Sequence, residues 1–184
     1  IIFGESIAKN IGFLFKREKL LVIDQPYIMN KVIKFKTAIK YPITIGVVGR
    51  ADKSKNINEL FKLLELLEYE IKNNLIKVKI VGKLYEKLDD RYINSLSYFT
   101  ETISNELLES EIQTLDFALS FTDKNYYKAI PSGVLFDCIK WNLPILGLKN
   151  DYISYYFSRY GKFGELFDTT EEMANFLKQL LIEL

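Results

Sequence analysis

The sequence predicts an α/β protein in which a doubly wound parallel sheet has helices on both faces. From position 42 onward, short apolar runs alternate with longer stretches whose apolar residues recur at helical spacing. Residues 116–148 read in order as a strand, a loop, a short helix and a second strand, which is the βαβ unit of a parallel sheet. At 184 residues, 48% apolar and 14% aromatic, the chain can bury the core of one ordinary domain.

The first 40 residues are mixed in character and predict a separate part of the chain. Residues 5–15 fit an amphipathic helix, and residues 19–24 fit a short strand. Residues 29–40 place four lysines among apolar residues and are interpreted as a solvated connector. We therefore divide the chain into a linker or edge segment over residues 1–40 and an α/β domain over residues 41–184.

Two strands and a helix open the α/β domain. Residues 43–48 are a β-branched run that predicts a strand, and residues 76–81 predict the next one. Between them, apolar residues recur at helical spacing from 57 to 71. Asn56 stands at the expected N-cap and Glu59 at the capping-box position three residues later. We expect these two side chains to satisfy the first turn of the helix.

The end of the domain continues the alternation. Residues 98–103 fit a short strand, and Ser104 is expected to cap the helix that follows it. Residues 165–168 fit a last strand. Thr169 and Glu172 then predict the capping box of a last helix.

The central unit is the part of the chain that predicts a site. Residues 117–121 and 145–148 are its two strands, Ser132 and Gly133 open its helix, and Pro144 ends that helix because the residue before a proline disfavours helical geometry. In such a unit, the loop after the first strand and the amino end of the helix face one crevice. Unpaired backbone N–H groups and the helix dipole favour an anion there.

Composition excludes several classes of function. With 25 basic and 24 acidic side chains, a net charge of +1, the chain has no global field directed at nucleic acid or an anionic membrane. One cysteine allows no internal disulfide, and with no histidine a zinc or redox-metal site is not expected. No apolar run approaches the about 20 residues that span a bilayer, and the first residues are not built like a signal peptide. Because the chain begins with Ile, we expect a piece of a longer protein.

The first candidate site is the turn after strand 43–48, which contains Gly49, Arg50 and Lys55. Arginine and lysine beside a helix amino end can hold a diphosphate by charge-assisted hydrogen bonds, each contributing about 1.5–3 kcal/mol where water is excluded. The turn is neither a Walker loop nor the GxGxxG dinucleotide fingerprint, which the chain lacks. Taken alone, it fits a solvated loop with ordinary lysines better than a site.

The second candidate site is Ser132, Gly133 and Val134 with Asp137 one turn further along the helix. Gly133 would let a phosphate approach the backbone closely. Asp137 would lie on the same helical face, within reach of hydroxyl groups such as those of a ribose. The alternative for Asp137 is a surface carboxylate that the helix dipole stabilises.

The third candidate is an aromatic segment over residues 152–163, which we interpret as a loop. Its tyrosines and phenylalanines would suit the wall of a binding cleft, but packing over the sheet edge is the favoured interpretation. Cys138 is expected to fill the core.

From about residue 43 to its end, the chain resembles the C-terminal, nucleotide-sugar-binding domain of GT-B-fold glycosyltransferases, nearest to glycosyltransferase family 4. There the first strand typically ends in Gly-Arg followed five residues later by Lys, as Gly49, Arg50 and Lys55 do here. A later family stretch, E-G-F-G-x-x-x-x-E-A-x-x-x-G-x-P-V, is matched in part by residues 129–145.

Within that stretch, Gly133, Asp137 and Pro144 match the neighbourhood of the second glycine, the second acid and the proline. Ala129 stands in place of the first glutamate and Asn142 in place of the later glycine. The change at Ala129 leaves open both the sugar of the donor and whether its anomeric configuration is retained.

The resemblance implies a Rossmann-like donor-binding domain, with residues 1–40 as the tail of an N-terminal lobe and the interdomain link. Arg50 and Lys55 would hold the donor diphosphate without a metal or other cofactor. The backbone from Gly49 and around 132–134 would meet the phosphate or sugar, and Asp137 would replace the ribose-binding glutamate of the family.

The implied function is that of the donor-binding half of a glycosyltransferase, which moves a sugar from a nucleoside diphosphate to a glycan or lipid-linked acceptor. The acceptor would be held by the N-terminal lobe, so this chain alone should bind nucleotide without turnover. A cytoplasmic location, at most peripheral to the inner face of the membrane, suits the family. The alternatives are a sugar-nucleotide epimerase or phosphorylase of the same fold, and a non-catalytic module that binds a partner through its aromatic segment.

Overall fold

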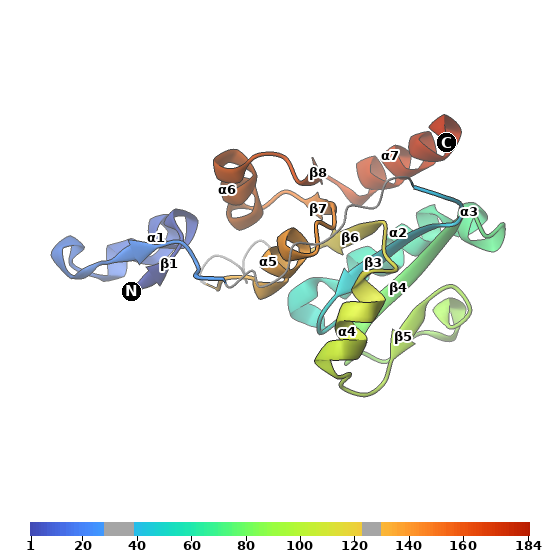
Figure 1. The fold of residues 1–184 in the computed structure, drawn as a ribbon, viewed down its shortest axis with the longest axis horizontal. Coiled ribbons are helices and arrows are strands. Elements are labelled where there is room, and N and C mark those ends of the chain that lie inside the picture. Colours follow the sequence, from blue (N-terminus) through green and yellow to red (C-terminus); the bar gives the residue numbers. More distant parts are fainter. Residues whose placement is uncertain (28–38, 123–129) are drawn as a thin grey trace.

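The structure, a computed structural model, describes residues 1–27, 39–122 and 130–184. Over these ranges it has a two-stranded sheet near the N-terminus and a six-stranded sheet at the centre of the α/β domain (Figure 1). The six strands are all parallel, in the order β5-β4-β3-β6-β7-β8. The predicted doubly wound parallel sheet is therefore confirmed.

The strands of the large sheet are close to the predicted ones. The prediction over residues 43–48 is confirmed without change, whereas the strand predicted over 98–103 is shorter and begins one residue earlier. Neighbouring strands β3 and β4 pair along the whole of β3, from Ile43 opposite Ile76 to Val48 opposite Val81. The six strands are β3 (Ile43–Val48), β4 (Ile76–Lys83), β5 (Ser97–Phe99), β6 (Phe117–Ser120), β7 (Ile145–Leu148) and β8 (Gly164–Phe167).

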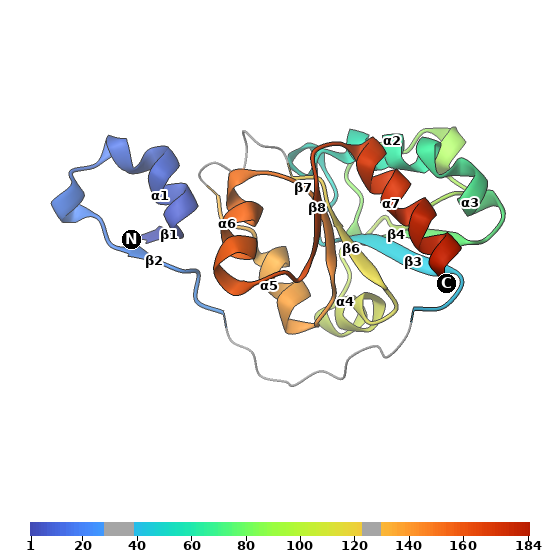
Figure 2. The same ribbon diagram turned by 90° about the horizontal axis from the view of Figure 1, so that it is seen from above.

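Helices cover both faces of this sheet, as Figure 2 shows. One face carries α2 (Ile57–Leu66), α3 (Glu68–Lys72) and α7 (Thr170–Glu183). The opposite face carries α4 (Asn105–Ile112), α5 (Gly133–Lys140) and α6 (Asp151–Tyr160). None of the described helices is both long and apolar enough to cross a bilayer.

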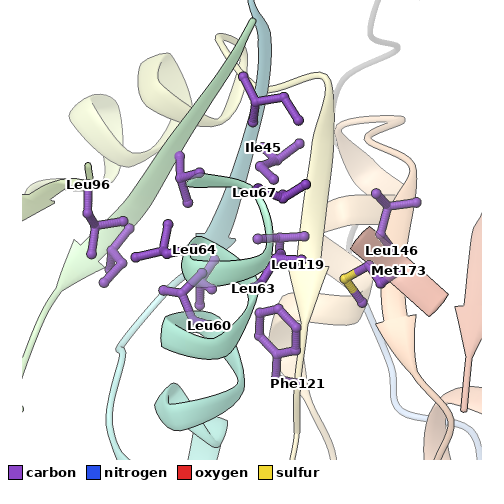
Figure 3. Close-up of a cluster of buried hydrophobic side chains, with 14 of the residues drawn as sticks. Ile45, Leu60, Leu63, Leu64, Leu67, Leu96, Leu119, Phe121, Leu146 and Met173 are labelled. Atoms are coloured by element: carbon purple, nitrogen blue, oxygen red, sulfur yellow. The ribbon is translucent and has the colours of Figure 1, made fainter. Parts of the chain in front are cut away.

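The two faces hold separate hydrophobic clusters because side chains alternate along each strand. Ile45 of β3 lies under α2, where it joins Leu119 of β6 and Leu146 of β7 (Figure 3). Val48 of β3 belongs to the cluster beneath α5 and α6 instead. The α2 side of the first cluster is a stripe of fully or nearly fully buried leucines: Leu60, Leu63, Leu64 and Leu67.

Two of the predicted helix caps are confirmed. The Ser104 hydroxyl accepts a hydrogen bond from the backbone N–H of Leu107 at 3.2 Å, and α4 begins directly after it. The Thr169 hydroxyl accepts from the backbone N–H of Glu172 at 3.2 Å, at the start of α7. Each bond satisfies one of the N–H groups that a helix start leaves without a helical partner.

The prediction for Asn56 and Glu59 is wrong in its details. Asn56 does precede α2, but its backbone is left-handed, with φ of 50°, and its side chain makes no capping hydrogen bond. The short 3-10 helix Lys53–Lys55 ends at the residue before Asn56, and α2 begins at the residue after it. Asn56 therefore joins two helical segments, and its left-handed backbone separates them. Glu59 instead accepts a hydrogen bond from the hydroxyl of Thr170, which links α2 to the start of α7.

The aromatic segment is also different from the prediction, because most of it is the helix α6 and not a loop. The helix begins after Asn150, whose side-chain oxygen accepts from the backbone N–H of Ile153 at 3.0 Å. Tyr152 and Tyr156 lie on its buried side, one turn apart. The packing role expected for these aromatic residues is therefore confirmed, whereas their loop structure is not.

The N-terminal segment forms a small unit of two parallel strands and a helix: β1 (Ile2–Phe3), α1 (Glu5–Ile11) and β2 (Val22–Ile23). The helix is shorter than the predicted one over residues 5–15, because a 3-10 turn, Gly12–Leu14, follows it. The predicted connector over residues 29–40 lies largely outside the described residues. Ile7 packs in the same cluster as Tyr156, so α1 rests on α6.

Asp24, directly after β2, ties this unit to α6. Its carboxylate accepts hydrogen bonds from Tyr155 and Arg159, each at 3.0 Å, and from the hydroxyl of Tyr160. Burial acts to raise the pKa of Asp24, but the hydrogen bonds from Tyr160 and Tyr155 and the charge of Arg159 outweigh it and lower that pKa. The folded state therefore favours the ionised carboxylate.

Gly82, near the end of β4, lies directly against the backbone of the turn after β3. Its φ is 148°, and a Cβ placed on it would lie 2.2 Å from the carbonyl oxygen of Gly49. A side chain cannot occupy that space, so the backbone after β3 would have to move away. The turn that follows β3 therefore depends on glycine at position 82.

We predict that Gly82→Ala lowers the free energy of unfolding by about 2–5 kcal/mol, because the new methyl group meets backbone atoms and the positive φ is strained. Urea denaturation measures this loss. Gly133→Ala is the control, since a Cβ there would meet nothing within 4 Å, and we expect it to retain stability. A loss of less than about 1 kcal/mol for Gly82→Ala would contradict the close approach.

We also predict that the contribution of Asp24 depends on pH. Because its folded pKa is lowered, the stabilisation is present above the unfolded pKa of about 4 and is lost as the pH falls through the folded pKa. Asp24→Asn should thus reduce the thermal midpoint at pH 7, and the deficit relative to wild type should shrink below about pH 4. Thermal scans at pH 7 and below about pH 4 test this. If the difference in midpoint between the variant and the wild type is the same at both pH values, the hydrogen bonds to Asp24 do not stabilise its ionised form.

Candidate functional site

A cavity opens where the strand order reverses, at the carboxyl ends of β3 and β6. The chain continues from β3 to one edge of the sheet and from β6 to the other, and such a reversal is where ligands bind in open α/β sheets. The floor of the cavity is apolar, and its polar groups come from Lys55, Ser120, Thr122 and Ser132. The rest of its lining is Val47, Val48, Ala118, Leu119, Phe121, Val134, Leu135, Cys138, Ile145, Tyr152 and Ile153.

The turn after β3 forms one wall of the site. Gly49 has φ of 82°, and a Cβ on it would lie 3.2 Å from the Cγ2 of Val134, so the turn rests against the start of α5. Asp52 shapes the next residues by accepting from the backbone N–H of Ser54 at 2.9 Å and from its hydroxyl at 2.6 Å. This local bonding starts the 3-10 helix Lys53–Lys55.

Lys55 reaches the cavity and is partly buried. Burial lowers the pKa of its ammonium group, while the charges of Asp52 and Asp137 act in the opposite direction. The surroundings of Lys55 therefore disfavour its charged form. An anion bound beside it would restore the preference for the charged form.

Arg50 is not among the residues that line the cavity. Its guanidinium Nε lies 2.6 Å from the Oδ2 of Asp52, and the group stands 5.8 Å from the centre of the Tyr85 ring. The side chain is 58% exposed. Of the two cations predicted to act together, the structure thus places Lys55 in the site and directs Arg50 toward Tyr85.

The start of α5 forms the opposite wall. Ser132 is buried and precedes the helix, but its side chain makes no capping hydrogen bond. Gly133, the first helical residue, is exposed, with open space where a Cβ would project. Val134 follows and lines the cavity. The amino end of an eight-residue helix therefore faces the same space as Lys55, and its dipole favours an anion.

Asp137 lies one turn beyond Gly133 and is already engaged within the chain. The hydroxyl of Tyr27, from the segment after β2, donates a hydrogen bond to its Oδ1. The charge of Asp137 acts on Lys55 and offsets part of the lowering of the Lys55 pKa by burial. The structure therefore brings Asp137, Lys55 and the start of α5 into one neighbourhood.

Thr122 and Tyr152 belong to the site; Thr122 was not predicted, and for Tyr152 the wall of a cleft was the less favoured of two interpretations. Thr122 is buried after β6, where its hydroxyl accepts from the side-chain amide of Asn150 at 2.7 Å. Its position directly after a strand of the central unit was the signal that could have revealed it. Tyr152 was assigned to a loop, which concealed its place in the wall. Cys138 fills the core as expected, and burial raises the pKa of its thiol to about 12.

Within the described ranges, no group of three or more carboxylate, thiol or imidazole side chains is placed to hold a metal ion. The polar groups of the cavity are a lysine ammonium, hydroxyls and the backbone of a helix start. Such groups bind an anion directly.

No family model matches the sequence, and no curated protein matches it either. Solved structures do. Over 98% of this chain and 36% of the other, it superposes on a TarM variant of S. aureus with a TM-score of 0.71 at 15% identity. That protein is in complex with UDP, alpha-GlcNAc-glycerol and Fondaparinux.

Two further structures agree. The C-terminal domain of LpcC, a group 1 glycosyl transferase of Francisella tularensis, matches 78% of this chain over 77% of its own, with a TM-score of 0.54 and 13% identity. A UDP-forming alpha,alpha-trehalose-phosphate synthase from Burkholderia vietnamiensis matches 76% of this chain over 36% of its own, with a TM-score of 0.56 and 10% identity.

The fold is that of the C-terminal domain of GT-B glycosyltransferases. At these identities the likeness shows the fold alone, and it confirms the C-terminal, Rossmann-like domain that the sequence resembles. The chain spans about a third of the length of TarM, at 36%. Its N-terminal unit falls inside that match, since 98% of the chain is covered.

Proposed function

We propose that this chain is the donor-binding half of a glycosyltransferase, which transfers a sugar from a nucleoside diphosphate to a glycan or lipid-linked acceptor. The observation that carries the proposal is the meeting of Lys55 with the amino end of α5 at the strand reversal. The TarM variant is in complex with UDP, and the trehalose-phosphate synthase is UDP-forming. Both support a nucleoside diphosphate as the ligand of this chain.

The proposed chemistry is stabilisation of the leaving diphosphate. As the bond to the sugar breaks, negative charge grows on the phosphate oxygen. A fixed ammonium group and oriented backbone N–H groups stabilise that charge without rearranging. In this proposal Lys55 and the backbone from Ser132 to Val134 supply those groups, and no metal is required.

Arg50 would join the diphosphate only after leaving Asp52. The Arg50 side of this ion pair is exposed, and pairs at the surface stabilise by about 1 kcal/mol at most, so a dianion can compete for the guanidinium. In the proposal, Lys55 already lies in the cavity, whereas Arg50 moves to the diphosphate when the donor binds. Gly49 keeps the turn close enough to α5 for both walls to contact one ligand.

The acceptor side would come from a preceding lobe, of which residues 1–40 are the tail and the link. Parallel sheets are normally buried on both faces, but the sheet of β1 and β2 has only two strands. Large apolar side chains around it are exposed: Ile1, Phe13, Leu14, Phe15, Leu21 and Ile23. In the proposal, strands of the preceding lobe extend this sheet and cover these side chains.

The partner-binding alternative gains no support from α6. Tyr152 and Tyr156, the central aromatic residues of that helix, are buried within the chain, and Tyr155 is bonded to Asp24. An epimerase or phosphorylase of the same fold would use the same diphosphate site, so product analysis on a longer protein distinguishes these activities.

We predict that one of UDP, GDP, ADP, dTDP or CMP raises the thermal midpoint of the chain. A ligand at a hundredfold excess over its dissociation constant adds about 2.7 kcal/mol of stability. Lys55→Met should abolish the shift, because it keeps the aliphatic stem and removes the charge.

Lys53→Met is the matched control, because Lys53 lies in the same 3-10 helix but is exposed, and we expect it to keep the shift. Arg50→Ala should reduce the shift by less than Lys55→Met does. Repeating the scans with Mg²⁺ tests the metal-independent part of the proposal. A shift that survives Lys55→Met, or no shift with any nucleotide, would refute the assignment of this site.

We further predict that the chain alone binds donor without transferring sugar, because the acceptor side of the cleft is absent from it. The test incubates the chain with UDP-glucose or UDP-N-acetylglucosamine and glycan acceptors, and follows products by mass spectrometry. Robust sugar transfer by this chain would contradict the prediction.

A further inference from the structure

Tyr27, in the segment after β2, contacts the helix α5 of the α/β domain. Its ring stacks on that of Phe136 in α5, with centroids 5.6 Å apart and planes inclined by 19°. Its hydroxyl donates to the Oδ1 of Asp137, the next residue of the same helix. One side chain therefore makes two contacts with α5, an apolar one and a charge-assisted one.

The Tyr27 hydroxyl remains protonated and so remains the hydrogen-bond donor to Asp137. Burial raises the pKa of Tyr27, and the hydrogen bond to Asp137 and the charge of that carboxylate raise it further. The phenol thus keeps its proton throughout the physiological range and always faces Asp137 as a donor. Hydrogen bonds to a charged acceptor are also stronger than neutral ones.

Asp137 is close to the cavity without lining it, because its charge acts on Lys55, a lining residue. It lies four residues after Gly133, on the same helical face, and Gly133 borders open space. A carboxylate accepts hydrogen bonds through both oxygens, and Tyr27 engages Oδ1. Holding one oxygen fixes the rotation of the group and therefore the direction of the other.

We propose that Tyr27 is a positioning residue, which holds the Asp137 carboxylate in the orientation that receives the ribose hydroxyls of the donor. The inference rests on the proposed function, because it requires a nucleotide at the start of α5. It adds that recognition of the ribose depends on a side chain from the segment after β2, outside the donor-binding domain itself.

The stacking contact allows the hydroxyl to be tested by itself. Tyr27→Phe removes one oxygen and keeps the ring on Phe136. Tyr155→Phe is the matched control, since it also removes a tyrosine hydroxyl bonded to a carboxylate of the segment after β2, Asp24, at 3.0 Å. The control loosens the same segment without contacting Asp137, so it reports any purely structural effect.

The experiment measures dissociation constants by calorimetry for UDP, GDP and ADP and for their 2′,3′-dideoxy counterparts. We expect the wild type to prefer the ribose form by roughly tenfold or more, as a hydrogen bond to a charged group implies. Tyr27→Phe should weaken the ribose form by about three- to tenfold and leave the dideoxy form unchanged. Asp137→Asn should reduce the same preference, and Tyr155→Phe should preserve it.

Each other result overturns the inference. Equal weakening of ribose and dideoxy forms would make Tyr27 a structural contact, and tighter binding by Tyr27→Phe would mean that its hydroxyl competes with the ribose. A wild type that binds both forms equally would show that Asp137 does not receive the hydroxyls. If the wild type binds no nucleotide at all, the proposed function fails, whereas binding with an unchanged preference in Tyr27→Phe refutes only the role of Tyr27.

Discussion

The reversal of strand order between β3 and β6 is the constraint on which the candidate site depends. The connection after β3 leads to α2 on one face of the sheet, and the connection after β6 leads to α5 on the other. Because the two connections leave in opposite directions, a crevice opens between the strand ends. Lys55 enters that crevice from one side and Ser132 from the other.

Within this crevice, the partly buried charge of Lys55 lowers the stability of the fold but favours the binding of an anion. The floor is apolar, and burial lowers the pKa of the ammonium group, so the domain holds a charge where its surroundings disfavour it. Strained or desolvated groups of this kind are typical of functional sites, where activity and stability make opposing demands. The charge of Arg50 makes a smaller demand, since its side chain is exposed and its guanidinium is paired with Asp52.

Most of the fold follows from local pattern in the sequence, because buried strands and amphipathic helices have distinct periods. The α6 helix was missed since tyrosines and phenylalanines are weak helix formers, although Tyr152 and Tyr156 stand one turn apart and Asn150 caps the start. Asn56 has the composition of a cap, but the preceding 3-10 turn determines its backbone. Composition cannot reveal that kind of competition.

The candidate site was predictable only as far as neighbouring residues define it. Lys55, Ser132 and Val134 line one cavity and Gly49 lies against Val134, because the ends of parallel strands lie at one edge. The direction of Arg50 depends on an ion pair and a ring contact that no motif encodes. The contact of Tyr27 with Asp137 joins residues 110 positions apart, and its prediction needs the tertiary fold.

Cys138 has a practical consequence for work on this chain. It is the single cysteine of the sequence, it is buried in α5, and burial raises the pKa of its thiol to about 12. Thiol reagents attack the thiolate, which is scarce here at neutral pH. For fluorescent or spin labelling, the native sequence thus behaves as a background without a reactive cysteine. A probe on a cysteine introduced at either wall of the crevice would report on that wall alone, with the hydrophobic core left intact.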